Sequence, residues 1–249
     1  MQLYPDIAYH FQEECSSTFD MIEELVERSP NQIHVAFSNE QSEGRGQRNK
    51  RWESPKNAGL YMSIYLPTLK LELNKSSYIN WALTLSVVQE LEVLGYKNIK
   101  IKWPNDLYTQ KGKLGGVLVI NETHKNEVCT SAIGLGINLK NIEVSNSSMG
   151  ITNLEQENPS IIFNQKLFIE SLTKKFVGLM YGPFIKFDAV YSKWREYLYG
   201  LGRFFHVELN AQVHKVLILD VNKDGSLSIE LNGEKLKVFS GNMKWLNAV

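Results

Sequence analysis

Hydrophobic and polar residues follow two periods along this chain, one typical of β-strands and one typical of α-helices. Apolar runs predict strands over residues 33–38 and 60–66. Helical spacing predicts a first helix through Met21, Ile22, Leu25 and Val26, a buried one through Ile79, Leu83, Val87, Leu91 and Leu94, and two later ones through Phe163, Leu167, Leu172 and Phe176 and through Phe184, Phe187, Val190 and Trp194. The polar stretch over residues 140–160 is expected to run over the surface. The mixture of elements indicates an α+β fold.

One predicted strand ends at a proline. Its apolar residues alternate with polar ones, which is typical of a half-buried strand: Ile99, Ile101 and Trp103 against Asn98, Lys100 and Lys102. Pro104 cannot continue a central ladder, so the chain must change direction there. Asn105 and Asp106 follow at the strand end, where a carboxylate is suited to hold a metal ion or to orient an amine.

A lysine precedes the next apolar run. Lys113 comes directly before residues 114–120, which are all apolar or glycine and predict a buried strand. A lysine at the mouth of a buried strand is suited to bind phosphate. A β-hairpin with Gly112 in its turn and a solvated Lys113 fits the same residues, so both interpretations stay open.

Residues 132–138 (AIGLGIN) predict a strand with two unlike faces. Ile133, Leu135 and Ile137 share one face, and the opposite face carries two glycines and ends at Asn138. Glycine within a strand often marks the close approach of a ligand or another backbone. The bare face therefore predicts the floor of a slot, with close packing of a helix as the competing interpretation.

Residues 42–52 (SEGRGQRNKRW) combine glycines with cations. Gly44 and Gly46 permit backbone conformations closed to other residues, and the cations beside them suit phosphate oxygens: Arg45, Arg48, Lys50 and Arg51. The spacing is neither that of a P-loop nor that of a dinucleotide-binding motif. Trp52 is suited to stack on a purine and equally to fill a core. A solvated basic loop with two turn glycines remains the alternative.

Composition limits the function classes. Lysine plus arginine and aspartate plus glutamate number 27 each, so the formal net charge is zero, and the strong basic charge of a nucleic-acid-binding chain is absent. No apolar stretch approaches the ~20 residues of a membrane span, and the first residues lack the pattern of a signal peptide. The cysteines, Cys15 and Cys129, are expected to be free thiols in a reducing compartment. We therefore expect a cytoplasmic protein without a membrane partner.

The pattern changes after about residue 200 to short strands separated by turns. Asn232-Gly233 is a strong signal for a type I′ hairpin between residues 227–231 and 236–239. A small antiparallel barrel is expected here, and an independent peptide-binding module is the alternative.

Four motifs in order resemble the biotin protein ligase family. They are G-R-G at residues 44–46, K-W-P-N-D at 102–106, K-L-G-G at 113–116 and G-x-G-I-N at 134–138. Their order and spacing match, and the similarity covers nearly the whole chain. The resemblance implies a mixed-sheet catalytic domain of the class II synthetase and biotin-lipoate ligase type over residues 1–199, followed by an SH3-like β-barrel over residues 200–249.

The resemblance also implies an activity. Members of the family are ATP-dependent, AMP-forming ligases that join biotin to ATP to form biotinyl-5′-adenylate and pyrophosphate. They then transfer biotin to one lysine of the biotin carboxyl carrier domain of a carboxylase. ATP, biotin and Mg²⁺ are thus the expected small molecules, and the carrier domain is the expected protein partner. A homodimer is left open. The Ser17-Thr18 pair comes too early for the N-terminal DNA-binding domain that some members carry, so we expect no DNA partner.

The family roles transfer to matching positions. The resemblance implies biotin-binding roles for Ser17, Thr18, Gln41, Gly44, Arg45, Lys113, Gly116, Leu118 and Gly134. It implies ATP-binding roles for Arg45, Arg48, Lys50, Trp52, Asn105, Lys113 and Asn138. Catalytic roles fall to Arg45 and Lys113, which would neutralise two anions brought together, and to Asp106, which would orient the carrier amine or hold the metal ion. Ser17 has a second interpretation as a helix cap.

The chain departs from the family pattern at two positions. Gln47 stands where some members have a further arginine, so Arg48 or Lys50 must carry that charge. Phe19 replaces the usual asparagine after the Ser-Thr pair.

Two alternative functions remain. A lipoate or octanoate ligase has the related fold, but K-W-P-N-D favours the biotin family. A non-catalytic biotin-sensing protein would have less need of the phosphate donors Arg45 and Lys113.

Overall fold

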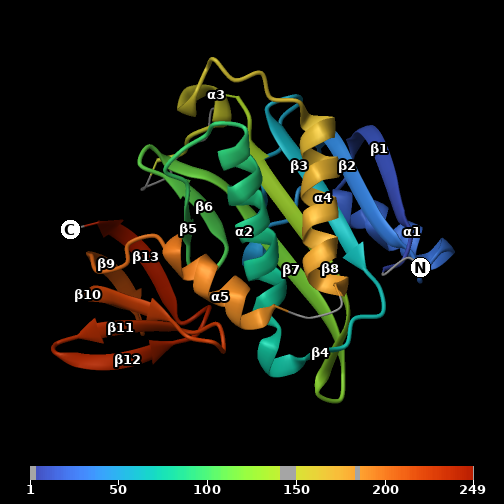
Figure 1. The fold of residues 1–249 in the computed structure, drawn as a ribbon. Coiled ribbons are helices and arrows are strands. Elements are labelled where there is room, and N and C mark those ends of the chain that lie inside the picture. The colour runs from blue at the N-terminus through green and yellow to red at the C-terminus, as the bar shows by residue number, and fades with distance from the viewer. Residues whose placement is uncertain (1–3, 141–149, 183–185, 249) are drawn as a thin grey trace.

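The computed structural model describes residues 4–140, 150–182 and 186–248, which form two β-sheets with helices packed on the larger one (Figure 1). The large sheet has eight strands in the order β1-β2-β3-β8-β7-β6-β5, with β4 paired to β8. The strands β1 and β2 are parallel and all other neighbours are antiparallel, so the sheet is mixed as expected. Its strands are β1 (Ile7–Cys15), β2 (Ile33–Gln41), β3 (Gly59–Leu66), β4 (Leu71–Glu72), β5 (Lys100–Lys102), β6 (Asp106–Thr109), β7 (Gly112–His124) and β8 (Glu127–Asn138).

The centre of this sheet is the pair β3 and β8. Every residue of β3 is buried, and its antiparallel register sets Tyr61 opposite Gly136 and Ser63 opposite Gly134. The strands predicted at residues 33–38 and 60–66 are thereby confirmed. Strand β1 was not predicted, because it lies at the sheet edge and its polar residues are largely exposed.

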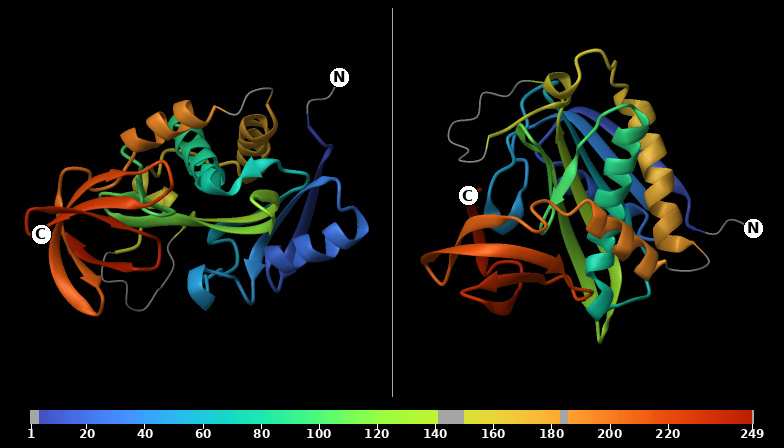
Figure 2. Two further views of the ribbon diagram at one scale, coloured as in Figure 1. Left: turned by 90° about the horizontal axis from the view of Figure 1, so that it is seen from below. Right: turned by 60° about the vertical axis from the view of Figure 1, so that its left-hand side comes forward.

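Helices cover both faces of the sheet unequally. Figure 2 shows α2, α4 and α5 over one face and α1 on the opposite face. The helices are α1 (Thr18–Arg28), α2 (Ser77–Val93), α3 (Leu154–Glu157), α4 (Gln165–Tyr181) and α5 (Phe187–Glu196), with short 3₁₀ turns η1 (Gln47–Asn49) and η2 (Leu73–Lys75). Because α2 packs against the sheet, α4 and α5 together, it is buried nearly all round.

Most predicted helical core residues are buried, with a few exceptions at helix ends. Leu94 caps α2 and is 39% exposed, and Leu167, in the first turn of α4, is 62% exposed. Both residues lie at helix ends, where packing against the neighbouring helix is incomplete. The helical spacing of apolar residues therefore overestimates their burial. Phe184 lies outside the described residues.

Two strands differ from the predicted burial. Lys102 is only 3% exposed although it lies on the polar side of the alternation in β5. Ile120, at the end of the run predicted to be buried, is 44% exposed. Ile120 pairs with Ala132 on the face of the sheet that carries α1, and α1 lies mainly over β2, β3 and β8, which leaves this part of β7 uncovered (Figure 2).

The predicted surface stretch at residues 140–160 is corrected in its described part. Residues 141–149 lie outside the described residues, but Thr152 is fully buried and Asn153 and Leu154 nearly so. They are buried because this segment pairs with the backbone of Lys113: Lys113 N donates to Gly150 O at 3.2 Å and Thr152 N donates to Lys113 O at 2.9 Å.

The second sheet is antiparallel and consistent with an SH3-like domain. Asn232 and Gly233 have φ angles of 53° and 84°, so the predicted type I′ turn is confirmed. Its strands, in the order β12-β11-β10-β9-β13, are β9 (Phe204–Leu209), β10 (Gln212–Val221), β11 (Leu227–Leu231), β12 (Glu234–Val238) and β13 (Met243–Ala248). The division of domains at residues 199 and 200 stays a prediction.

Tryptophan side chains join the two sheets. The indole nitrogen of Trp103, directly after β5, donates to Gly225 O at 2.8 Å. The indole nitrogen of Trp245 in β13 donates to Trp103 O at 3.0 Å. The first bond holds the turn between β10 and β11 against the end of β5, and the second holds β13 there.

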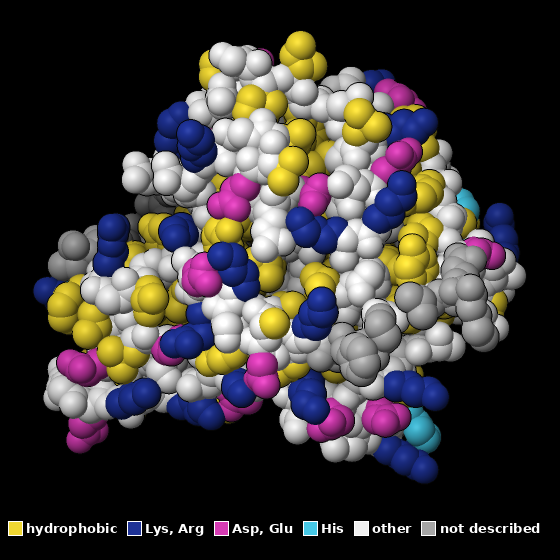
Figure 3. Space-filling view, in the orientation of Figure 1, with side chains coloured by type: hydrophobic (Ala, Val, Ile, Leu, Met, Phe, Trp, Pro, Cys, Tyr) yellow, Lys and Arg dark blue, Asp and Glu magenta, His cyan; other side chains and the backbone are white. Residues whose placement is uncertain are grey.

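The surface is mixed in charge. On the face shown in Figure 3, Lys and Arg side chains are interspersed with Asp and Glu, in keeping with the neutral net charge. Among the described residues, no helix has the length and apolar character needed to cross a membrane.

A buried hydrogen bond between α2 and α5 provides a test of the helical layer. Trp194 Nε1 donates to Thr84 Oγ1 at 2.9 Å, and both residues are fully buried. Thr84→Val should destabilise the protein by about 1–3 kcal/mol in urea unfolding, because it leaves the indole donor unsatisfied. Ser86→Ala is the matched control, since that hydroxyl bonds only the carbonyl of Ala82 in its own helix. Equal losses for the two variants would contradict the role given to this bond.

Candidate active site

A cavity of about 390 Å³ lies between the basic loop, the glycine-rich face of the sheet and β13. It brings together residues from every predicted motif. The predicted site residues that line it are Thr18, Gln41, Arg45, Arg48, Lys50, Trp52, Asn105, Asp106, Lys113, Gly116, Leu118 and Gly134. Three predicted residues, Ser17, Gly44 and Asn138, lie outside its lining.

The floor of the cavity is the glycine face of β7 and β8. A Cβ atom added to Gly134 would lie 2.5 Å from the ring of Phe19, and one added to Gly136 would lie 2.5 Å from the ring of Trp52. The face lacks side chains as predicted, but two aromatic rings cover it. Because Phe19 belongs to α1, the alternative of close helix packing applies at Gly134.

The ring of Trp52 forms the middle of the site. Its Nε1 is buried and has no hydrogen-bond partner among the described residues. The ammonium of Lys113 lies 5.2 Å from the centre of the ring, within the range of a cation–π contact. An unsatisfied indole donor costs stability in a closed interior. It therefore suits a site where a ligand supplies the acceptor.

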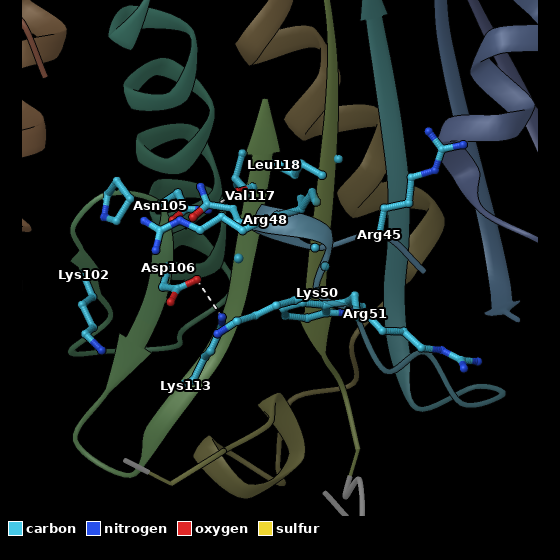
Figure 4. Close-up of a pocket in the computed structure, with 18 of the residues that line it drawn as sticks. Arg45, Arg48, Lys50, Arg51, Lys102, Asn105, Asp106, Lys113, Val117 and Leu118 are labelled. Carbon is cyan, nitrogen blue, oxygen red and sulfur yellow. Dashed lines mark hydrogen bonds and ion pairs between the residues drawn. The ribbon is translucent and has the colours of Figure 1, made fainter. Parts of the chain in front are cut away.

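Lys113 and Asp106 form an ion pair at the cavity wall. Lys113 Nζ lies 2.7 Å from Asp106 Oδ1, and both side chains are partly exposed (Figure 4). The two residues lie on neighbouring strands of the β6–β7 hairpin, in which Gly112 has a φ angle of 140°. The hairpin interpretation is thus confirmed for the backbone, but Lys113 faces the cavity and a carboxylate instead of open solvent. A side chain at position 116 would displace the Asp106 carboxylate, since a Cβ on Gly116 would lie 2.9 Å from Asp106 Oδ1.

Asn105 supports this wall through the backbone. Its side-chain amide donates to Val117 O, and Val117 N donates to Asn105 O at 3.0 Å. These bonds hold the turn after Pro104 against β7. Asn138 also serves the backbone, because its amide donates to Thr152 O at 3.0 Å and to Lys113 O at 3.3 Å. It thereby ties the strand of Lys113 to the segment beside it.

A polar network lies at the other end of the cavity. Gln41 Oε1 accepts from Thr18 N at 2.8 Å and from Thr18 Oγ1 at 3.1 Å. The Thr18 hydroxyl is also 2.7 Å from Ser63 Oγ, and Gln41 Nε2 donates to Ser54 Oγ at 2.8 Å. Ser17 caps α1, since its hydroxyl accepts from Phe19 N at 3.3 Å. The structure therefore favours the capping interpretation of Ser17.

The cations of the basic loop point in different directions. The guanidinium of Arg45 pairs with Asp20 and, at 2.9 Å, with Glu23, both on α1. In Figure 4, Arg45 and Arg51 extend to one side, while Arg48 extends to the side of Asn105 and Asp106. Arg48 has a φ angle of 55°, an uncommon conformation for a non-glycine residue, which turns its side chain across the cavity.

Sequence reasoning missed several lining residues. Lys102 was assigned only to a half-buried strand, and the lining residues of β13, Met243, Lys244 and Trp245, carry no motif. Burial of Lys102 lowers its pKa to about 8, an effect that Asp106 opposes and Lys113 reinforces. Lys102 keeps to the polar side of β5, but Trp245 of β13 covers that side, which the alternation in the sequence cannot indicate.

A resident metal site does not fit the described residues. They contain no group of three or more His, Cys, Asp or Glu side chains that could hold an ion. Asp106, the predicted ligand, is instead paired with Lys113.

Comparisons with known proteins agree with the motifs. The model of the biotin/lipoate A/B protein ligase family matches residues 12–138. The bifunctional ligase/repressor BirA of Escherichia coli is 35% identical over 120 residues, which cover 47% of this chain and 36% of that protein. Biotin–protein ligase 2 of Arabidopsis thaliana is 29% identical over 168 residues, or 65% of this chain and 49% of that protein. The chain thus matches between a third and a half of the length of these relatives.

Solved structures share the fold. A biotin protein ligase from Aquifex aeolicus in complex with biotin and ATP superposes with a TM-score of 0.72 at 21% identity, covering 98% of this chain and all of that one. The family match covers just over half of the 249 residues. It includes the basic loop and the β6–β7 and β7–β8 hairpins, and therefore the glycines of β8. The chain therefore belongs to the biotin/lipoate A/B protein ligase family.

Proposed function

We propose that the chain is a biotin protein ligase, which activates biotin with ATP and transfers it to a lysine of a biotin carboxyl carrier domain. The observation that carries this proposal is the Lys113–Asp106 pair at 2.7 Å, set against Trp52 above a glycine floor. This arrangement offers a cation beside an aromatic ring at the wall of the cavity. It suits an acyl adenylate, which joins a planar base to a charged phosphate.

The polar end of the cavity, at Thr18 and Gln41, favours biotin over lipoate. Thr18, Gln41 and Ser63 form a connected set of donors and acceptors there. The ureido ring of biotin can both donate and accept hydrogen bonds, whereas the dithiolane ring of lipoate cannot donate any. The dithiolane ring would cover these polar groups without offering them a hydrogen-bond donor, which would cost affinity relative to biotin. A lipoate ligase is therefore the second candidate, and a pure biotin sensor the third.

The first chemical step needs neutralisation of the negative charges of the biotin carboxylate and the α-phosphate, and it needs no proton transfer. The carboxylate of biotin is ionised at neutral pH and attacks the α-phosphorus of ATP directly. A new carboxylate oxygen–phosphorus bond forms while the bond to pyrophosphate breaks, and the electron pair leaves with pyrophosphate. Lys113 would offset the charge where the two anions meet. Mg²⁺ would enter with ATP as part of that substrate, and no step is assigned to it.

The second step joins the carrier lysine to biotin. The amine attacks the acyl carbonyl, the carbon–oxygen bond to AMP breaks, and the amine loses a proton. Asp106 lies beside Lys113 at the cavity wall and would orient the incoming amine. A cytoplasmic location and the absence of a DNA partner remain predictions, and a homodimer is left open.

We assign roles to the arginines of the basic loop from the direction in which each side chain points. Arg45 pairs with two carboxylates of α1, so we assign it to anchoring the loop over the site. Arg48 crosses the cavity and would carry the phosphate charge that Gln47 lacks.

Exchange of labelled pyrophosphate into ATP tests the proposed function directly. We expect exchange that depends on biotin and not on lipoate, because the first step is reversible and needs only biotin, ATP and the metal salt. Transfer to a purified carrier domain, followed by mass, should then add one biotinyl group. Exchange with lipoate alone would promote the second candidate, and biotin binding without any exchange would promote the sensor.

Lys113→Ala should lower the rate of exchange about 10²-fold or more, which is the usual loss when one preorganised donor to a transition-state charge is removed. The melting temperature should change little, since Lys113 is partly exposed. Lys111→Ala, two residues earlier in the exposed turn, is the matched control and should keep its rate. Full exchange by the Lys113 variant would refute the role assigned to this side chain.

The variants Arg48→Gln and Lys50→Gln test which of the two cations binds the phosphates of ATP in place of the family arginine at position 47. We expect the Arg48 variant to raise the KM for ATP about tenfold or more, because its guanidinium reaches into the cavity. The Lys50 variant should have the smaller effect, and the biotin Kd, measured by titration without nucleotide, should stay constant in both. The reverse order of effects on KM would move the phosphate contact to Lys50.

A further inference from the structure

One carboxylate outside the cavity connects two segments of the chain that are far apart in the sequence. Glu157, the last residue of α3, accepts from Thr152 Oγ1 at 2.6 Å and from Thr109 Oγ1 at 2.9 Å, through the same oxygen, Oε1. Thr152 is fully buried and Thr109 is 5% exposed. These three residues are not among those that line the cavity, so the cluster lies behind its wall.

The two threonines belong to the two neighbours of β7 at the position of Lys113. Thr109 is the last residue of β6 and lies opposite Gly112 of β7. On the other side of β7, beyond the end of β8, the segment that carries Thr152 is the neighbour, and Thr152 N donates to Lys113 O at 2.9 Å. Glu157 therefore connects both neighbours of β7 at the start of that strand.

The segment beside β7 lies unusually close to it. A Cβ on Gly112 would lie 2.6 Å from the carbonyl carbon of Gly150, and Lys113 N donates to Gly150 O at 3.2 Å. The helix α3 that follows has only four residues, too few to be stable alone. Its position depends on bonds to its surroundings, of which the backbone bond from Glu155 N to Leu139 O at 3.1 Å is one.

Hydrogen bonds, and not an ion pair, make the connection at Glu157. Lys111 Nζ is 4.0 Å from Glu157 Oε2 and its side chain is 55% exposed, so this contact adds little. Hydrogen bonds from hydroxyl groups to a carboxylate are among the stronger ones in proteins, and here both are at least partly shielded from water.

We propose that Glu157 is a positioning residue for Lys113. Its carboxylate holds β6 and the Thr152 segment in place on either side of β7. The backbone of Lys113 is thereby fixed, and with it the ammonium that pairs with Asp106 at 2.7 Å. The inference rests on the proposed function, in which Lys113 offsets the charge where biotin meets the α-phosphate. A small displacement of such a group lowers the rate, because its effect depends on its position in the transition state.

The kinetics of biotin-dependent pyrophosphate exchange test this role. Glu157→Ala should lower kcat about tenfold and leave the KM values for ATP and biotin within about threefold of the wild type, because Glu157 lies outside the cavity. Glu157→Gln should keep kcat within about threefold, since its side-chain oxygen can still accept from both hydroxyls. The matched control is Glu155→Ala, which removes an exposed carboxylate from the same helix and should keep the full rate.

A double-mutant cycle separates positioning from a general loss of structure. Because Glu157 acts through Lys113, Glu157→Ala should change the rate by less than about twofold in a Lys113→Ala background. Thr152→Val removes one of the two donors and should lower kcat in the same direction, with no further loss when it is combined with Glu157→Ala. Thermal unfolding verifies that each variant is folded. An equal loss in both backgrounds, or wild-type kcat in Glu157→Ala, would overturn the proposal.

Failure of the proposed function would be seen separately, as absence of exchange by the wild type. Hydrogen exchange of the Lys113 amide, followed by NMR, then decides whether Glu157 holds this strand. The amide donates to Gly150 O, and it should exchange at least about tenfold faster in Glu157→Ala than in the wild type or in Glu155→Ala. Equal protection in the three proteins would overturn the proposal.

Discussion

The close approach of aromatic rings to the backbone of β8 is the constraint on which the site depends. Gly134 and Gly136 admit the rings of Phe19 and Trp52 to distances that no Cβ atom would allow. The same close spacing holds between the strands, since a Cβ on Gly115 would lie 2.5 Å from Gly136 O. The glycines therefore do not make the sheet flexible. They allow the rings of Phe19 in α1 and Trp52 in the basic loop to lie directly on the sheet, where they form part of the cavity wall.

The polar groups are arranged around these rings by their backbone positions. Lys113 is fixed over Trp52 because its strand is bonded to β6 on one side and to the segment at Gly150 and Thr152 on the other. The Asn138 side chain reinforces that connection instead of facing the cavity. A cation held in this way needs little reorganisation when negative charge develops beside it, which is the condition for strong electrostatic stabilisation.

Much of this could be predicted from the sequence, because motif residues that are close together in the chain remain close in the fold. The 102–106 and 113–116 motifs lie on one hairpin, so the neighbourhood of Asp106 and Lys113 follows from local structure. Directions of side chains could not be predicted in the same way. Arg45 and Arg48 are three residues apart in one loop, yet only the position of α1 determines that the first meets Asp20 and Glu23.

The residues that the second sheet contributes to the cavity could not be predicted from any local sequence pattern. A period-two alternation gives Lys102 to the polar side of β5, and that is where its side chain lies. What the period cannot indicate is that β13, about 140 residues later, covers that side with an indole ring. Lys102 thus lies on the side of β5 that the sequence predicts, and it is buried because another strand covers that side. Burial between the two sheets lowers the pKa of Lys102 to about 8, because desolvation disfavours its charged form. The C-terminal sheet therefore shapes the surroundings of β5, and a segment without any recognisable motif contributes residues to the cavity wall.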